Sequence, residues 1–460
     1  MEVVKNKSDL LSHGNVSGRR LLVDIVEYAL EAMDPRKQVK RLVKVENGES
    51  LKVGGIKYSL SKIDGIYVLG AGKGSVFIAE ALEEVLNDRI RDGIVVEKRG
   101  QGKRLKRIKV LEAGHPIPDK SGYEAAQSIV ELAKDVGEGD LVFVCITGGA
   151  SALLPLPAEG ISLEDKIVLT DMLLRCGARI DEINAVRNHI SLIKGGRLAQ
   201  YIHPAEMINF IVVDEVAGLP WGPTVPDKST FQDAVYVLKK YGLYDKVPPS
   251  IKNHLERGLR DKSLETPKPS DFQGIKVHNF ILGNAEMVCE AADKRARELG
   301  LNSMILSTMI EGESKDVGIV LAGIAKEIAK NGRPIAPPCA VISGGETTVT
   351  ITGEAGEGGR NQELALSFST MIKDNERIAF ASVATDGTDG PTNIAGGIVD
   401  GYTLKRAEEL GIDVSEHIIK HNTSYVLKRL NDAIYTGPTG TNVMDLRVLI
   451  VLDSKTIPRF

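Results

Sequence analysis

Short apolar segments alternate with glycine-rich turns and amphipathic stretches along most of the chain. Five apolar segments each end at a polar cluster: 65–70, 141–146, 208–213, 340–343 and 378–384. After the first of them, residues 75–86 place apolar side chains at helical spacing. Alternating strands and helices predict an α/β protein with parallel or mixed sheets covered on both faces. Ligands bind at the carboxyl ends of strands in such sheets, so the polar clusters are candidate site residues.

The length of 460 residues indicates two or three domains. Residues 255–276 are charged and proline-containing and lack apolar periodicity, which is typical of a linker. A predicted strand and an amphipathic stretch ending at Gly300 follow it. We therefore expect an N-terminal domain over residues 1–270 and a C-terminal domain over residues 271–460. The stretch 331–338 is a second candidate boundary.

Composition narrows the class of protein. The net charge is −4 with both signs interspersed, which gives no reason to expect nucleic acid or an acidic membrane as a partner. No apolar run is long enough to span a bilayer, and the N-terminus lacks the apolar core of a secretory signal. The four cysteines are far apart in sequence, so we expect small buried side chains and a reducing cytoplasm. The sequence leaves a homodimer open.

The first polar cluster is a glycine-rich turn that contains Lys73. It matches neither the Walker A loop nor the Rossmann fingerprint, because Gly74 follows the lysine and Ser75 stands where a third glycine is needed. Backbone N–H groups of Gly72, Gly74 and Ser75 at a helix N-terminus suit a phosphate, and Lys73 adds a positive charge. The alternative is a surface lysine in a tight turn.

A second turn, "TGGASALL" at 147–154, follows the next strand. The residues that could bind an anion there are Thr147, Gly148, Gly149 and Ser151. The alternative is an ordinary helix cap. A hydrolase nucleophile at Ser151 is disfavoured, because the Gly-x-Ser-x-Gly pattern is absent.

The stretch 186–200 is basic and surrounds a Gly-Gly pair. Arg187 and Lys194 could bind a carboxylate or a phosphate there. The alternative is a solvated helix face followed by a turn, with His189 in a structural role.

Acidic residues follow two other strands. Asp214 ends the segment 208–213, and Asp386 and Asp389 lie in "TDGTDGPTN". Carboxylates at strand ends can bind a divalent metal or act as a general base. The alternatives are a helix cap for Asp214 and Asp-Gly turns for the other two.

The densest polar stretch is 343–366, where "TTVTITG" at 347–353 alternates as a strand and a glycine-rich loop ends at an arginine. Such an arginine suits clamping phosphates. The candidate residues are Gly344, Gly345, Glu346, Thr347, Arg360 and Asn361. Basic residues on glycine turns together with strand-end acids are typical of phosphoryl transfer around Mg²⁺, and they suit hydride transfer poorly.

Eight blocks in order resemble the class II glycerate kinases, whose C-terminal region is known as MOFRL, over nearly the whole chain. They are "GAGKGS" (70–75), "AGHPIPD" (113–119), "TGGASALL" (147–154), "VRNHISLIKGGRLA" (186–199), "GPTVPD" (222–227), "SGGETTVT" (343–350), "GGRNQELAL" (358–366) and "ATDGTDGPT" (384–392).

The resemblance implies a larger Rossmann-like N-terminal domain, a smaller mixed α/β C-terminal domain and an active site in the cleft between them. It implies transfer of phosphate from ATP to D-glycerate, giving 2-phosphoglycerate, with Mg²⁺ required. The implied catalytic residues are Lys73, Asp214, Arg360 and Asp386, and the two aspartates are the implied metal ligands. The family's acid shortly after Asp214 is missing here, and Glu215 is a candidate replacement.

Two alternative functions remain at this stage. The first is an NAD(P)H-dependent hydroxypyruvate reductase, because relatives of the family have carried that name. The second is a non-catalytic regulator that binds a nucleotide.

Overall fold

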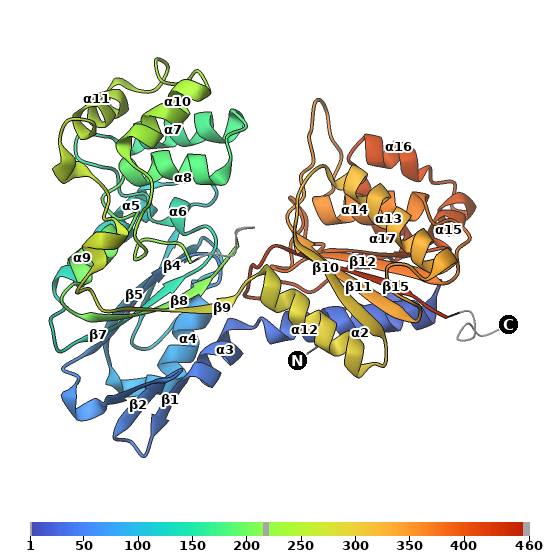
Figure 1. Cartoon of the computed structure of the whole chain (residues 1–460), viewed down its shortest axis with the longest axis horizontal. Coiled ribbons are helices and arrows are strands. Elements are labelled where there is room, and N and C mark those ends of the chain that lie inside the picture. The colour runs from blue at the N-terminus through green and yellow to red at the C-terminus, as the bar shows by residue number, and fades with distance from the viewer. Residues whose placement is uncertain (1, 215–219, 454–460) are drawn as a thin grey trace. The chain divides into compact units, whose positions relative to one another are not determined.

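The computed structural model describes residues 2–214 and 220–453. The chain forms two compact units (Figure 1). Residues 35–212 and 220–282 form one, here called the parallel-sheet unit. Residues 2–34, 213–214 and 283–453 form the other, here called the mixed-sheet unit. These units differ from the expected division at residue 270, because residues 2–34 pack with the C-terminal part of the chain.

The parallel-sheet unit contains six strands in the order β6-β5-β4-β7-β8-β9. The strands are β4 Ile66–Ala71, β5 Ile90–Lys98, β6 Lys109–Ala113, β7 Leu141–Ile146, β8 Glu206–Val212 and β9 Val277–Gly283. All pairs from β6 to β8 are parallel. Counted in chain order this is 3-2-1-4-5-6, the Rossmann-type doubly wound order. The order reverses between β4 and β7, which is the switch point of the sheet.

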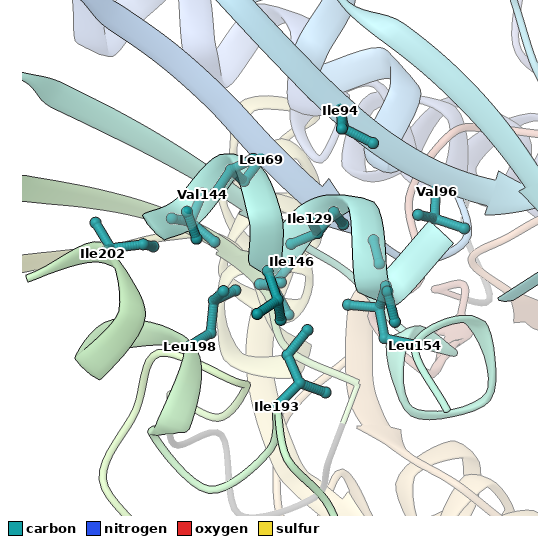
Figure 2. Packing of buried hydrophobic residues seen from close by; sticks show 14 of the residues in the cluster. Leu69, Ile94, Val96, Ile129, Val144, Ile146, Leu154, Ile193, Leu198 and Ile202 are labelled. Atoms are coloured by element: carbon teal, nitrogen blue, oxygen red, sulfur yellow. The ribbon is translucent and has the colours of Figure 1, made fainter. Parts of the chain in front are cut away.

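Helices cover both faces of this sheet, which explains the continuous apolar runs in its strands. On one face, α5 (Lys120–Lys134) and α9 (Arg197–Ile202) pack against alternate side chains of β4 and β7. Figure 2 shows Leu69, Val144, Ile129 and Leu198 in this core. The other face carries α4 (Ser75–Leu86), which contacts β4, β5 and β7.

Four helices form a separate apolar cluster within the same unit. They are α7 Leu163–Arg175, α8 Ile180–His189, α10 Phe231–Lys240 and α11 Pro249–Gly258. Residues 255–276 are not a free linker, because Glu265 pairs with His189 at 2.6 Å and Thr266 is buried. The unit also contains α3 Pro35–Leu42 and the antiparallel strands β1 Val43–Glu46, β2 Ser50–Val53 and β3 Ile56–Ser59.

The mixed-sheet unit has the strand order β10-β11-β15-β12-β13-β14. Its strands are β10 Asn302–Ile310, β11 Cys339–Gly345, β12 Ile378–Ala384, β13 Gly396–Asp400, β14 Ala433–Ile434 and β15 Asp445–Val451. Only β10 and β11 pair in parallel, and β15 runs antiparallel between β11 and β12. The predicted strands at 340–343 and 378–384 are confirmed.

Two helix layers enclose this sheet. Helices α2 (Val16–Ala32) and α12 (Ala285–Glu298) pack on one face, as Figure 1 shows. Helices α13 (Ser314–Asn331) and α14 (Arg360–Thr370) pack on the other face, and α15 (Thr403–Glu409), α16 (Val414–Ile419) and α17 (Thr423–Leu430) complete its core. None of the helices among residues 2–214 and 220–453 is long and apolar enough to cross a membrane.

A buried ion-pair network holds α2 in the mixed-sheet unit. Arg19 has an exposed fraction of 0%, and its guanidinium pairs with Asp400 and, at 2.7 Å, with Asp432. Burial alone would raise the pKa of the Asp432 carboxyl, but Arg19, His13 and Arg406 lower it to about 2. Removing one partner of such a network strands a charge in the core, so the network fixes the position of the N-terminal helix.

We predict that Arg19→Met lowers the free energy of unfolding of the mixed-sheet unit by about 3–5 kcal/mol, because Asp400 and Asp432 are left as buried carboxylates. Guanidinium titration followed by circular dichroism measures the change. The neighbouring exposed Arg20→Met is the matched control and should shift stability by less than about 0.5 kcal/mol. Equal effects of the two substitutions would contradict the assigned role of Arg19.

Candidate active site

Two turns are joined at the switch point of the parallel sheet. Lys73 N–H donates to the Gly148 carbonyl at 2.7 Å, and the Thr147 hydroxyl donates to the Lys73 carbonyl at 2.9 Å. Gly72 is required for this approach, because a Cβ there would lie 2.1 Å from Thr147 Oγ1. The turns after β4 and β7 therefore form one edge, with the half-buried Lys73 on it.

The N-terminus of α4 already holds an anion, which is a carboxylate of the protein. Glu97, fully buried on β5, accepts hydrogen bonds from the N–H groups of Gly74 at 2.9 Å and Val76 at 3.4 Å. Ser75 is also buried and donates to the Val96 carbonyl at 3.3 Å. The predicted phosphate contacts by Gly74 and Ser75 are therefore corrected: the Gly74 N–H donates to Glu97, and the Ser75 N–H donates to the Gly72 carbonyl at 3.1 Å. Within this turn, Lys73 remains the candidate for a role in the chemistry.

The second turn is shorter than the sequence indicated. Helix α6 spans only Ala150–Leu153. Thr147 is buried and its hydroxyl is used by Lys73, so it acts in the turn itself. Gly149 and Ser151 are partly exposed, and their role in anion binding stays a prediction, as does that of the buried Gly148.

His115 joins this edge, and the sequence reasoning assigned it no role. It follows β6, and a Cβ on Gly149 would lie 2.8 Å from its imidazole. Burial, followed by repulsion from Lys73 and Lys98, lowers the pKa of His115 to about 4. The ring is therefore neutral near pH 7 and can exchange hydrogen bonds beside Lys73 without adding charge. The sequence signal for His115 was the block "AGHPIPD", which contributed only to the family resemblance.

The basic stretch after α8 is buried instead of solvated. Lys194 is only 8% exposed, while Arg187 is partly exposed. The solvated-face alternative is therefore wrong for Lys194. Two neighbours are structural: His189 contacts Glu265, and Arg197 donates to the carbonyls of Leu264 and Glu265.

In the mixed-sheet unit, Arg360 begins α14 and lies between two carboxylates. Its guanidinium makes a bidentate pair with Asp445 at 2.9–3.1 Å and donates to Glu346 at 2.6 Å. Asp445 also accepts from Asn361 at 2.8 Å. The side chain of Arg360 is 29% exposed, so it faces solvent at one side of a neutralised cluster. The sequence reasoning missed Asp445, because it begins a strand far from the glycine-rich loop.

The two aspartates of "TDGTDGPTN" have different roles. Asp389 is buried and accepts from the N–H groups of Asn361 at 3.1 Å and Gln362 at 2.9 Å, so it caps α14. Burial, and then the charge of Asp445, raise the pKa of Asp389 to about 6. Asp386 is partly exposed and accepts from Thr388. Of the two, only Asp386 presents a carboxylate to solvent.

Asp386 and Asp214 contact the same loop. The Thr439 N–H donates to the Asp386 carbonyl at 3.3 Å, and Asn442 Nδ2 lies 3.5 Å from Asp214 Oδ2. Asp386 meets this segment through its backbone and Asp214 through its carboxylate, and a shared metal-binding role for the two stays a prediction. Glu215, the candidate replacement acid, lies outside the described residues.

Residues at the end of β11 that were predicted to bind phosphate have structural roles. A Cβ on Gly345 would lie 2.3 Å from the Ile310 carbonyl oxygen, so this glycine permits strand packing. Thr347 is buried and accepts from Ser314 at 2.9 Å. Both Gly344 and Gly345 lie within the buried strand. The expected strand at 347–353 is absent; Thr348 forms only an isolated bridge with Glu313.

No group of three or more metal-ligating acidic, histidine or cysteine side chains occurs within residues 2–214 and 220–453. Mg²⁺ does not need one, because it commonly binds through one or two carboxylates together with substrate phosphates and water. The pair Asp214 and Asp386 fits that pattern. All four cysteines are free, and three of them are buried, as expected.

The doubly wound sheet with a lysine at its switch point, together with a mixed-sheet unit rich in strand-end acids, defines a two-unit α/β protein suited to anionic ligands. Two family models match: one described as a domain of unknown function, DUF4147, over residues 21–256, and the MOFRL family over residues 339–445.

Relatives match over nearly the full length. A glycerate 2-kinase of Pyrococcus horikoshii is 44% identical over 95% of this chain and 98% of that protein. A D-glycerate 2-kinase of Thermotoga maritima is 38% identical over 94% and 98%. A crystal structure of a Thermotoga maritima glycerate kinase matches with a TM-score of 0.81 at 36% identity, covering 94% of this chain and 99% of that one. The chain belongs to the MOFRL family of glycerate kinases.

We predict that Glu97→Gln makes stability less dependent on pH. Burial raises the pKa of Glu97 to about 7, although the N–H groups of Lys98, Val76 and Gly74 oppose the rise. A carboxyl whose pKa is raised on folding stabilises the fold most below about pH 4.3, its ordinary pKa, and that contribution is lost as pH rises through about 7.

The free energy of unfolding of the parent should therefore fall by up to about 3 kcal/mol between pH 4.5 and 8 relative to the variant. Urea titrations of both proteins across this range measure the difference. A difference that stays constant with pH would show that the Glu97 carboxyl does not titrate in this way.

Proposed function

We propose that the protein transfers the γ-phosphoryl group of ATP to the 2-hydroxyl of D-glycerate, giving 2-phosphoglycerate. The observation that carries the proposal is Lys73, which the paired turns hold at the switch point of a doubly wound sheet. Full-length relatives named glycerate 2-kinase support the choice of substrate.

The reaction needs positioning and charge neutralisation more than covalent chemistry. The 2-hydroxyl oxygen attacks the γ-phosphorus, the bond to the β,γ-bridging oxygen breaks, and ADP leaves with that electron pair. Lys73 and Arg360 offset the negative charge on the transferring group. The hydroxyl proton passes to a carboxylate, which is Asp386 or Asp214.

Asp214 and Asp386 would bind Mg²⁺, since both are partly exposed and contact the loop that carries Thr439 and Asn442. When bound, Mg²⁺ neutralises charge on phosphate oxygens. Glu346 and Asp445 hold the Arg360 guanidinium in one orientation, so this side chain is preorganised for an incoming anion. Gly148, Gly149 and Ser151 are the remaining candidate contacts for phosphate oxygens.

We also propose that the enzyme works in the cytoplasm, because its cysteines are free. A homodimer is the proposed assembly, and light scattering after gel filtration tests it.

Incubation with ATP, Mg²⁺ and D-glycerate should release ADP and give a product that enolase converts directly. Phosphorus NMR distinguishes 2-phosphoglycerate from the 3-isomer. Two Agrobacterium vitis relatives, 37% and 34% identical, carry a provisional name as hydroxypyruvate reductase. Oxidation of NAD(P)H by hydroxypyruvate without ATP, in place of ADP release, would favour that activity. ATP binding without any turnover would favour a regulator.

Lys73→Ala should lower kcat by about 10²- to 10³-fold, because the side chain acts on charge that develops in the transition state. Steady-state kinetics with the coupled assay measure the change. Lys103→Ala is the matched control: this lysine, in the same unit, pairs with Glu80 at 2.9 Å and should leave kcat unchanged. Near-normal turnover of Lys73→Ala would remove Lys73 from the mechanism.

A further inference from the structure

Three cationic side chains from three different segments of the parallel-sheet unit lie close enough for their charges to influence one another. Lys166 lies on α7, Arg187 lies on α8, and Lys194 lies in the turn before α9. Lys166 is 3% exposed, and its Nζ donates to the Ile190 carbonyl at 3.2 Å, between the other two in the chain. Together they are here called the cationic triad.

The described part of the chain supplies no counter-charge to the triad. Among residues 2–214 and 220–453, no carboxylate forms an ion pair with Lys166, Arg187 or Lys194, and the Ile190 carbonyl is the one hydrogen-bond acceptor of these side chains. The nearby acids are already engaged. Glu265 binds His189, Asp165 binds Ser250, and Glu182 binds Lys240 and Tyr241.

Burial and mutual repulsion weaken the charged forms of these side chains. Burial, followed by the charge of Arg187, lowers the pKa of Lys166 to about 7. Burial, followed by the charges of Lys166 and Arg187, lowers the pKa of Lys194 well below its usual range. Buried cations of this kind are unfavourable unless an anion compensates them, and structural lysines in cores are normally paired.

The segment that carries Lys194 shares a core with the carboxyl end of β7. Ile193, directly before Lys194, packs in one core with Ile146 and Leu154 (Figure 2). Ile146 is the last residue of β7 before the Thr147 turn. Two backbone hydrogen bonds join the segment 190–194 to the segment that follows the Thr147 turn. The Leu192 N–H donates to the Leu156 carbonyl, and the Ala158 N–H donates to the Ile190 carbonyl. The segment that carries Lys194 is therefore tied to the segment that follows the Thr147 turn.

We propose that the cationic triad binds the carboxylate of the acceptor, a small 2-hydroxy acid. This rests on the proposed function, because that function supplies the acceptor. A carboxylate matches the planar, bidentate geometry of Arg187, and its negative charge would compensate the buried lysines. The polyphosphate of a nucleotide carries several charges and stays partly solvated, which suits the more open edge at Lys73.

The test uses the full-length enzyme with Lys166→Met and Lys194→Met, which keep side-chain length and remove the charge. Calorimetry with D-glycerate alone, in the absence of ATP, should show at least tenfold weaker binding in each variant. Calorimetry with ATP and Mg²⁺ should give an unchanged Kd. The melting temperature of the ligand-free variants should equal or exceed that of the parent, because an uncompensated buried charge has been removed.

Lys268→Met is the matched control, because Lys268 is a half-buried lysine that is paired with Glu265 at 3.0 Å. It should lower the melting temperature and leave D-glycerate binding unchanged. If the methionine variants do not fold, Arg187→Gln, at a partly exposed position, supplies the same comparison of D-glycerate with ATP.

Unchanged D-glycerate binding in the folded variants would overturn the proposal. Selective loss of ATP binding would overturn it as well, and would assign the triad to phosphate. If the parent binds D-glycerate and the variants do not, the proposed role of the triad in binding the carboxylate is supported, even if the parent transfers no phosphate. Turnover with an unchanged KM for D-glycerate in the variants would contradict the proposed role of the triad and leave the proposed function intact.

Discussion

The close approach of β4 and β7 at the switch point is the constraint on which the parallel-sheet unit depends. A side chain at Gly72 would collide with Thr147, and the two turns exchange hydrogen bonds through Lys73 and Gly148. The strands on either side then lead their connections to opposite faces, which opens an edge between them. Lys73, His115 and Gly149 reach this edge from the ends of three strands.

Carboxyl groups of the protein itself occupy the N-termini of two helices, α4 and α14. Glu97 caps α4, and Asp389 caps α14, although both helices follow glycine-rich turns that suggest phosphate sites. Positive charge for a ligand must therefore come from side chains. Two arrangements supply it: Arg360 is paired with and oriented by Asp445 and Glu346, whereas no acid within residues 2–214 and 220–453 pairs with the cationic triad. The guanidinium of Arg360 is held in place by acids of the protein, whereas the charge of the cationic triad is compensated only when an anion binds.

Local sequence patterns predicted the buried strands well. The apolar runs at 66–71, 141–146 and 378–384 are strands at nearly the expected bounds, because their periodicity reflects burial on both faces. The failures involve partners distant in sequence. Residues 255–276 look like a linker until Glu265 is seen against His189, and the alternation at 347–353 indicates a strand although no neighbouring strand pairs with it. Among the candidate residues, the sequence singled out Asp386, Asp214 and Arg360, whose roles stay predictions, but not Glu97 and Asp445, since nothing local marks a carboxylate that reaches a turn across a sheet.

The division of the chain makes the parallel-sheet unit an insertion within the mixed-sheet unit. Arg19 must wait for Asp400, 381 residues later, before its charge is compensated. At about 5–20 residues per second, a ribosome needs roughly 20–80 s to supply that partner. During this time α2 exposes an apolar face and a cation, while the parallel-sheet unit can already fold behind it. Helix α2, near the start of the chain, thus gains its buried counter-charge only late in synthesis, and any chaperone that acts on the nascent chain should engage that segment.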